Sequence, residues 1–327
     1  MTFITAEVGI NHNGSVDLAK RIIEAAKWAG ADAVKLQKRT VEIVYAGQLE
    51  QIRESPWGNT LGDQKRGLEL SSQDYDEIDR FCREIKIPWF ASAWDHESLS
   101  FLDKYDLPFM KIASAMVTNW GFVAAVAKRA KPVFMSTAMC TDQMLFQAMG
   151  YFDGRLEDVT LMHCIGMYPA PEWSLNLQAI PYLHAKFGVK VGYSGHENSV
   201  SPSVVAAALG AVVIERHLTI DRTMYGSDQA ASLEPHGLKT LVEQIRKVPV
   251  VMGDGVRKIL PGEVETSRKL RYFDKTQGVQ VHVENHVEKS EDPLESRRKA
   301  AIDPNRRVVL VRDESQGGAG GSAQDGA

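Results

Sequence analysis

The chain has 327 residues, with 38 basic and 42 acidic side chains and a formal net charge of −4, a balance that excludes the basic surface of nucleic-acid-binding proteins. Hydrophobic residues make up 44% of the chain, yet the sequence shows neither a secretory signal nor an apolar run of membrane-spanning length. The three cysteines are too widely spaced for a disulfide framework, so we predict a reduced, cytoplasmic protein without nucleic-acid or membrane partners.

Short apolar runs alternate with amphipathic segments along the chain, which is typical of repeated β-α units around a parallel sheet. The predicted strands cover residues 3–10, 33–37, 88–94, 109–114, 133–137, 159–164, 189–194 and 212–217. Eight strands, each followed by a helix, predict an α/β protein with a closed (β/α)8 TIM barrel.

The first and last helices of this barrel have the clearest sequence signals. Ser15 is a plausible N-cap of the first helix and Gly30 a stop signal. The apolar stripe between them is Leu18, Ile22, Ala25, Ala26 and Ala29. The last helix is predicted from about residue 235 to 248, with an apolar stripe of its own. Its stripe is Leu238, Leu241, Val242 and Ile245.

Two stretches fall outside the regular pattern. Residues 38–70 have no sustained period, and a loop of that length is usually a functional lid or wall. We assign residues 1–273 to the barrel domain and 274–327 to an extended C-terminal tail, whose glycine-rich end is predicted to be disordered. Within the tail, residues 279–283 and 308–311 have the composition of isolated strands.

Polar residues recur where the predicted strands end, and in a barrel these ends meet on one face. They are Glu7, Asn11, His12, Lys35, Gln37, Ser92, Lys111, Ser114, Ser136, His163, Tyr168, Ser194, His196, Glu215 and His217. Two lysines and three serines of this set suggest a site that holds phosphate or carboxylate. The alternative for the lysines is a structural ion pair with Glu7 or Glu215, and the alternative for each serine is a bond to local backbone.

Two histidines at neighbouring strand ends, His196 and His217, suggest a divalent cation. Taken singly, each could equally be a hydrogen-bonded rim residue. His163 has the alternative of a hydrogen-bonded core histidine, and His12 that of a capping or substrate-binding group.

Several motifs line up together in order and spacing. They are EVGINHNG at 7–14, KLQ at 35–37, KIAS at 111–114, STAM at 136–139, HC at 163–164, YP at 168–169, YSGH at 193–196 and ERH at 215–217. From about residue 4 to about residue 270 the chain resembles the sialic acid synthase family. The resemblance implies a transferase in which a (β/α)8 barrel condenses phosphoenolpyruvate with an aldehyde sugar, giving a 3-deoxy-2-ulosonic acid and phosphate.

The resemblance also implies roles for individual residues. It assigns phosphoenolpyruvate contacts to Lys35, Lys111, Ser114, Ser136 and Ser194, an Mn²⁺ or Mg²⁺ ion to His196 and His217, and acceptor contacts to Gln37, Asn59, Tyr168 and Asp228. The two lysines would stabilise the departing phosphate. Glu7 is a further catalytic candidate that would steer water or protons.

Three departures from the family fall on the acceptor side. Met116 replaces an acidic residue that engages acceptor hydroxyls, and Gly166 replaces a common asparagine. The family's C-terminal antifreeze-like domain, which takes part in homodimerisation, is not recognisable after residue 273. We therefore predict that the acceptor is not N-acetylmannosamine, and a homodimer is one possible assembly.

Two other functions stay open. A related synthase could join phosphoenolpyruvate to an aldose phosphate, and Lys38 with Arg39 could supply the basic cluster that such an acceptor needs. A catalytically inactive barrel that serves as a binding partner is the non-enzymatic alternative.

Overall fold

The computed structural model describes residues 1–271. By its contacts the chain divides into a unit of Met1–Val256 and a second unit from Arg257, whose described part carries helix α11 (Pro261–Leu270). The strands predicted at 279–283 and 308–311 and the predicted disordered end lie outside the described residues. The domain boundary at residue 273 stays a prediction.

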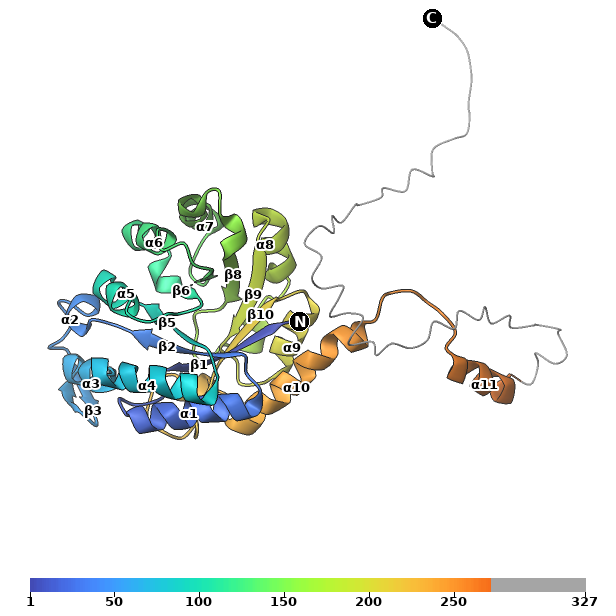
Figure 1. Ribbon diagram of the computed structural model, residues 1–327, viewed down its shortest axis with the longest axis horizontal. Helices are drawn as coiled ribbons and strands as arrows, with labels where there is room; N and C mark the ends of the chain where they lie inside the picture. The colour runs from blue at the N-terminus through green and yellow to red at the C-terminus, as the bar shows by residue number, and fades with distance from the viewer. Residues whose placement is uncertain (272–327) are drawn as a thin grey trace, which may run out of the picture. The chain divides into compact units, whose positions relative to one another are not determined.

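The first unit is the predicted closed barrel of eight parallel strands. The barrel strands are β1 (Phe3–Gly9), β2 (Ala33–Lys38), β5 (Trp89–Ala93), β6 (Met110–Ile112), β7 (Val133–Ser136), β8 (Val159–Cys164), β9 (Lys190–Gly195) and β10 (Val213–His217). Their order around the barrel is β1, β2, β5, β6, β7, β8, β9 and β10, and β10 pairs with β1 to close it. Figure 1 shows the helices around these strands.

Helices follow the strands along the chain. They are α1 (Val16–Ala29), α4 (Ser72–Ile85), α5 (His96–Leu102), α6 (Trp120–Ala127), α7 (Asp142–Met149), α8 (Ala179–Phe187), α9 (Ser201–Ala208) and α10 (Pro235–Met252). Short 3-10 turns are η1 (Ser114–Met116), η2 (Gly150–Phe152), η3 (Leu156–Asp158), η4 (Glu172–Ser174) and η5 (Gln229–Ala231). The whole predicted stripe of α10 is buried.

Helix α1 begins and ends where its capping residues predict. The Ser15 hydroxyl accepts a hydrogen bond from the Leu18 N–H at 3.2 Å, which satisfies one of the free amides of the first turn. Gly30 ends the helix in the left-handed region, at φ 88°, which a residue without Cβ adopts at low cost. Ile22 and Ala26 are buried on the face toward the barrel.

The segment predicted as an irregular loop, residues 38–70, contains regular structure, so that prediction was wrong. It forms α2 (Val41–Val44), an antiparallel hairpin of β3 (Ile52–Ser55) and β4 (Gly58–Thr60), and α3 (Leu61–Leu68). These elements are short and partly exposed, so they leave no hydrophobic period in the sequence. The Gln64 amide donates to the Tyr225 hydroxyl at 2.6 Å, so the segment is a wall that contacts the loop after β10.

Aromatic rings fill the barrel interior below the polar ends of the strands. Phe109 and Phe134 stack with ring centroids 4.8 Å apart, and Phe90 lies 5.6 Å from each of them. Because side chains alternate along a strand, residues two positions further on point to the same side. These residues are Lys111, Ser136 and Ser92. The rings therefore form an apolar floor beneath a polar layer.

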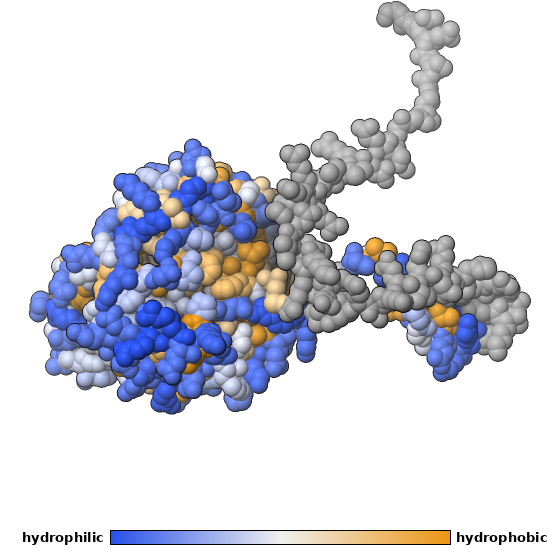
Figure 2. All heavy atoms as spheres, in the orientation of Figure 1, coloured by the Kyte–Doolittle hydropathy of each residue, from blue (hydrophilic) through white to orange (hydrophobic). Residues whose placement is uncertain are grey.

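The surface of the barrel unit agrees with amphipathic helices. On the face shown in Figure 2, hydrophilic residues cover most of the area, and hydrophobic residues gather in smaller patches. Within residues 1–271, no helix combines the length and the apolar character needed to cross a membrane.

Buried His12, just after β1, makes the fold sensitive to acid. Its Nδ1 accepts a hydrogen bond from the Gly14 N–H at 3.1 Å, which requires an unprotonated Nδ1. Burial lowers the pKa of His12 from 6.5 to about 4. The unfolded chain therefore binds this proton at a higher pH than the folded chain does, and stability falls as pH decreases from 6.5 to 4.

We expect the free energy of unfolding to lose up to about 3 kcal/mol over this interval through His12 alone. His12→Asn keeps a hydrogen-bond acceptor that does not titrate. Urea unfolding at a series of pH values should show the wild type losing its advantage over the variant toward pH 4. A difference between the two proteins that does not change with pH would contradict this role of His12.

Candidate active site

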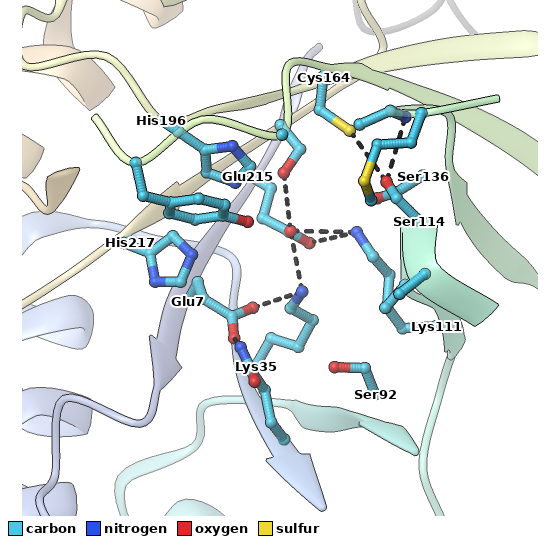
Figure 3. A pocket seen from close by; sticks show the side chains of 18 of the residues that line it. Glu7, Lys35, Ser92, Lys111, Ser114, Ser136, Cys164, His196, Glu215 and His217 are labelled. Atoms are coloured by element: carbon cyan, nitrogen blue, oxygen red, sulfur yellow. Dashed lines mark hydrogen bonds and ion pairs between the residues drawn. The ribbon is translucent and has the colours of Figure 1, made fainter. Parts of the chain in front are cut away.

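A cavity opens at the C-terminal ends of the barrel strands (Figure 3). The predicted site residues that line it are Glu7, Lys35, Gln37, Lys111, Ser114, Ser136, Tyr168, Ser194, His196 and His217. Ser92, Cys164 and Glu215 line it as well. Most of the predicted site is therefore one physical site, assembled from strands that are far apart in the sequence.

Glu215, which the sequence suggested only as a structural partner, is at the centre of this cavity (Figure 3). Its carboxylate accepts from Lys35 Nζ at 2.8 Å, from Lys111 Nζ at 3.0 Å and from the Ser194 hydroxyl at 3.0 Å. Lys35 forms a second ion pair with Glu7. The ion pairs that were the structural alternative are present, and they lie in the cavity wall, where a ligand can also reach the lysines.

Burial sets the charge balance of this cluster. It lowers the pKa of Lys35 to about 7, an effect that Glu215 opposes and Lys111 reinforces. Burial alone would raise the pKa of Glu215, but Lys111 and Lys35 outweigh it and hold that pKa below its ordinary range. An anionic ligand beside Lys35 would favour the protonated amine. Ligand binding would therefore raise the pKa of Lys35, and the positive charge would in turn strengthen ligand binding.

The serines of the cavity are not equivalent. The Ser114 hydroxyl accepts from the Ala138 N–H at 3.1 Å, so its backbone partner is not local but lies 24 residues further along the chain. The Ser194 hydroxyl is tied to Glu215 instead. Ser136 and Ser92 are buried in the lining on either side of Lys111. These hydroxyls offer donors around the two ammonium groups.

His196 and His217 line the same side of the cavity, from the ends of the paired strands β9 and β10, with ring centroids 5.6 Å apart. His196 Nδ1 donates to the Ile165 carbonyl at 2.7 Å, which leaves Nε2 as the free acceptor of a neutral ring. His217 Nδ1 is buried without a hydrogen-bond partner, 3.8 Å from Asp228 Oδ2. Tyr168 packs on His196 at a centroid distance of 4.0 Å.

The two imidazoles have the protonation state that metal ligation needs. Burial lowers the pKa of His196 to about 3, and burial also lowers the pKa of His217. Both rings are therefore neutral near pH 7. Residues 1–271 contain no group of three or more His, Cys, Asp or Glu side chains arranged to hold a metal ion.

Gly9, at the end of β1, leaves room for this arrangement. A Cβ at this position would lie 3.2 Å from Glu7 Oε1 and 3.2 Å from His217 Nδ1, closer than ordinary contacts. The residue also has φ 54°, where glycine carries the smallest penalty. Glycine at this position therefore keeps both functional side chains in the cavity.

A second buried ion pair lies behind the cavity wall. Glu215 and His217 line the cavity from β10, and Arg216 between them points to the other side. Its guanidinium donates to Glu197 Oε1 at 2.8 Å and to the Ser199 carbonyl at 2.9 Å. Arg216 therefore anchors the segment that follows His196. In the sequence, the signal for this buried ion pair is a charged residue in the middle of a buried strand.

Three predicted site residues are not in the cavity lining. Asn59 is exposed on β4, and Met116 is buried in the hydrophobic core. The prediction that Met116 faces the acceptor is therefore corrected, because its side chain packs inward from η1. Asp228 lies beside His217 without lining the cavity itself. His163 is the core histidine of the structural alternative, with Nε2 2.8 Å from the Leu175 carbonyl.

Comparison with known proteins finds relatives that cover most of this chain. Residues 22–257 match the model of the NeuB family. N-acetylneuraminate-9-phosphate synthase of Homo sapiens is 36% identical over 272 residues, which cover 82% of this chain and 76% of that protein. N,N'-diacetyllegionaminic acid synthase of Campylobacter jejuni subsp. jejuni is 35% identical over 269 residues, which cover 80% of each chain. The crystal structure of N-acetylneuraminic acid synthetase from Leptospira borgpetersenii matches with a TM-score of 0.72 and 28% identity over 83% of this chain and 93% of that one.

Proposed function

Because this chain belongs to the NeuB family, we propose that it condenses phosphoenolpyruvate with an aldehyde sugar to give a 3-deoxy-2-ulosonic acid and phosphate. Its relatives include synthases of several acids of this kind. The observation that carries the proposal is the buried Lys35–Glu215–Lys111 cluster inside the cavity at the strand ends. It concentrates two ammonium groups where a small polyanion can enter.

The lysines would hold the phosphate and carboxylate of phosphoenolpyruvate, with the serine hydroxyls as further donors. The phenylalanine floor below excludes water from one side, which strengthens these electrostatic interactions. Lys35 and Lys111 would then stabilise the charge of the departing phosphate.

The bond changes follow from this placement. C3 of phosphoenolpyruvate attacks the aldehyde carbon, the former aldehyde oxygen takes up a proton to become a hydroxyl, and the positive charge that develops at C2 is captured by water. The proton lost by that water has an acceptor in Glu7 or Glu215, which lie on either side of Lys35. The adduct at C2 then expels phosphate and leaves the ketone of the product.

An Mn²⁺ or Mg²⁺ ion held by His196 and His217 is part of the proposal. When bound, it supplies Lewis acidity toward the aldehyde oxygen. The neutral rings and the unpartnered His217 Nδ1 fit a cation with open positions for substrate. The homodimer and the cytoplasmic location stay predictions.

We also propose that the acceptor is not N-acetylmannosamine. The support for this part is Gly166, which lines the cavity where the family commonly has an asparagine. Glycine offers no side-chain amide to an acyl group. Met116 no longer supports this proposal, because it lies in the core.

Phosphate release tests the function directly. The purified full chain is incubated with phosphoenolpyruvate, Mn²⁺ and a panel of aldoses that includes N-acetylmannosamine. We expect phosphate release that depends on an aldose, together with a new ulosonic acid. Rapid turnover of N-acetylmannosamine would refute the acceptor proposal alone. Lack of phosphate release with every aldose would instead favour the inactive-barrel alternative.

Metal removal should abolish this activity. After treatment with EDTA we expect the rate to fall at least about 100-fold, because the aldehyde loses its polarising group, and added Mn²⁺ should restore the rate. His217→Ala should reproduce the loss without rescue by Mn²⁺. His236→Ala, at an exposed position of α10, is the matched control. Full activity in metal-free buffer would contradict the metal site.

A further inference from the structure

Asn11 lies in the turn after β1 and joins two segments that carry site residues. Its side-chain Nδ2 donates to the Leu218 carbonyl at 3.0 Å and to the Ser232 hydroxyl at 2.8 Å. Leu218 directly follows His217 at the end of β10, and Ser232 belongs to the loop that connects β10 to α10. Asn11 is 1% exposed and does not line the cavity, so it acts on the site only through these neighbours.

The direction of these hydrogen bonds is fixed by a carbonyl group at each end. The Leu218 carbonyl can only accept, so the nitrogen of the Asn11 amide must face it. The Ser232 hydroxyl donates to the Asp228 carbonyl at 2.7 Å, and it therefore accepts from Asn11. The amide thus links the peptide that follows His217 to the peptide of Asp228, and no other assignment of donors satisfies both carbonyls.

The backbone around His217 is held from two sides. The His217 carbonyl accepts from the Leu233 N–H at 2.8 Å, on the side of the returning loop. The Leu218 N–H donates to the Glu7 carbonyl at 2.8 Å, on the side of β1. Asn11 adds a side-chain contact on this second side, so the ring of His217 projects from backbone that is fixed in both directions.

The loop segment that carries Asp228 is tethered to the same asparagine twice. Gln229 Nε2, at the start of η5, donates to the Asn11 carbonyl at 3.4 Å. Ser232, just after η5, accepts from the Asn11 amide. Asp228 Oδ2 lies 3.8 Å from His217 Nδ1, so this loop decides where a charge sits beside the imidazole.

Packing alone does not account for an asparagine at this position. Asn11 Oδ1 is buried and has no hydrogen-bond partner within the described residues. A buried acceptor without a partner is unfavourable, and an apolar side chain of the same size would avoid that cost. The two hydrogen bonds that Nδ2 donates are therefore the contribution specific to the amide.

We propose that Asn11 is a positioning residue, which holds His217, and Asp228 beside it, in the arrangement that the divalent cation requires. The inference rests on the metal site of the proposed function and adds to it a residue that touches neither cation nor substrate. Without the amide, the Leu218 carbonyl and the Ser232 hydroxyl lose their donor, and the peptide after His217 is held from one side less. Residues that hold metal ligands in place typically change metal affinity about 10- to 100-fold.

Binding of Mn²⁺ alone tests this role, because it does not depend on turnover. The dissociation constant for Mn²⁺, from the EPR signal of the free ion, is compared in the purified full chain and in Asn11→Leu, Ser232→Ala and Asn119→Ala. Leucine keeps the approximate shape of asparagine but has no donor. Asn119 is exposed and caps α6 by accepting from the Phe122 N–H, so Asn119→Ala is a control that loses a hydrogen bond elsewhere. Melting temperatures show how much stability each variant loses.

We expect Asn11→Leu to weaken Mn²⁺ binding about 10-fold or more, and excess Mn²⁺ should restore its phosphate release. Ser232→Ala should weaken binding less, because the hydrogen bond to Leu218 remains. Asn119→Ala should bind Mn²⁺ as the wild type does, even if its melting temperature falls.

The possible failures are distinguishable. Wild-type Mn²⁺ affinity in a folded Asn11→Leu variant, or an equal loss of affinity in Asn119→Ala, would overturn the positioning role and leave the metal site in place. If Asn11→Leu does not fold, unchanged affinity in Ser232→Ala would overturn the role in the same way. No binding of Mn²⁺ by the wild type would instead overturn the metal site of the proposed function.

Discussion

Replacement of Lys111 by methionine is expected to lower kcat/KM for phosphoenolpyruvate about 100- to 1000-fold, the effect of removing one preorganised charge from a transition state. Lys111 is suited to this role because its side chain is 1% exposed and both oxygens of Glu215 lie 3.0 Å from its Nζ. Methionine keeps the length and the packing of the aliphatic stem but removes the charge. Initial rates of phosphate release at varied phosphoenolpyruvate concentration measure the effect.

Lys190→Met is the matched control for this experiment. Lys190 begins β9 and is exposed, whereas the cavity lies at the other end of the strands. The same chemical change there should leave the kinetics within about twofold, as for surface substitutions away from special features. Near-normal kcat/KM in a folded Lys111→Met variant would remove Lys111 from the mechanism. Since Lys35 still pairs with Glu215 in this variant, the carboxylate is not left alone.

Replacement of Arg216 by methionine should be the most damaging change to stability. Arg216 and Glu197 are both 0% exposed, so loss of the guanidinium leaves a buried carboxylate without its charge partner. Such changes cost about 3–5 kcal/mol. The free energy of unfolding from urea titration is the measurement. We also expect lower activity, because the same pair holds the segment that follows His196.

Two further variants serve as comparisons for Arg216→Met. Arg246→Met breaks the ion pair with Asp32, in which the side chains are 25% and 30% exposed, and should cost about 1 kcal/mol or less. The double variant Arg216→Met with Glu197→Gln removes both charges and should recover part of the lost stability. If Arg216→Met costs no more than Arg246→Met, the buried pair does not have the stabilising role assigned to it.

Much of the fold is predictable because its signals are local. The bounds of β8, Val159–Cys164, agree with the prediction at both ends, and α1 lies between its predicted cap and stop residues. Most barrel strands contain a short apolar run, and this pattern is a property of the local sequence that does not depend on which strands become its neighbours. The strand predicted at 109–114 is shorter, Met110–Ile112, because the chain turns into η1 at Ser114.

The cavity is partly predictable for a related reason. Once the strands are parallel and closed, residues at their C-terminal ends must meet, whatever their separation in the sequence. That is why Lys35, Lys111, His196 and His217 could be assigned to one site. Motif order then identified the family, since each motif occupies the end of a different strand.

The barrel, the family and the set of polar groups at the strand ends can be predicted from the amino-acid sequence, because periodicity and motif spacing are properties of the chain. What each of these groups faces depends on the folded arrangement of the strands. Glu215 became the centre of the site and Met116 part of the core because a side chain's surroundings come from other strands.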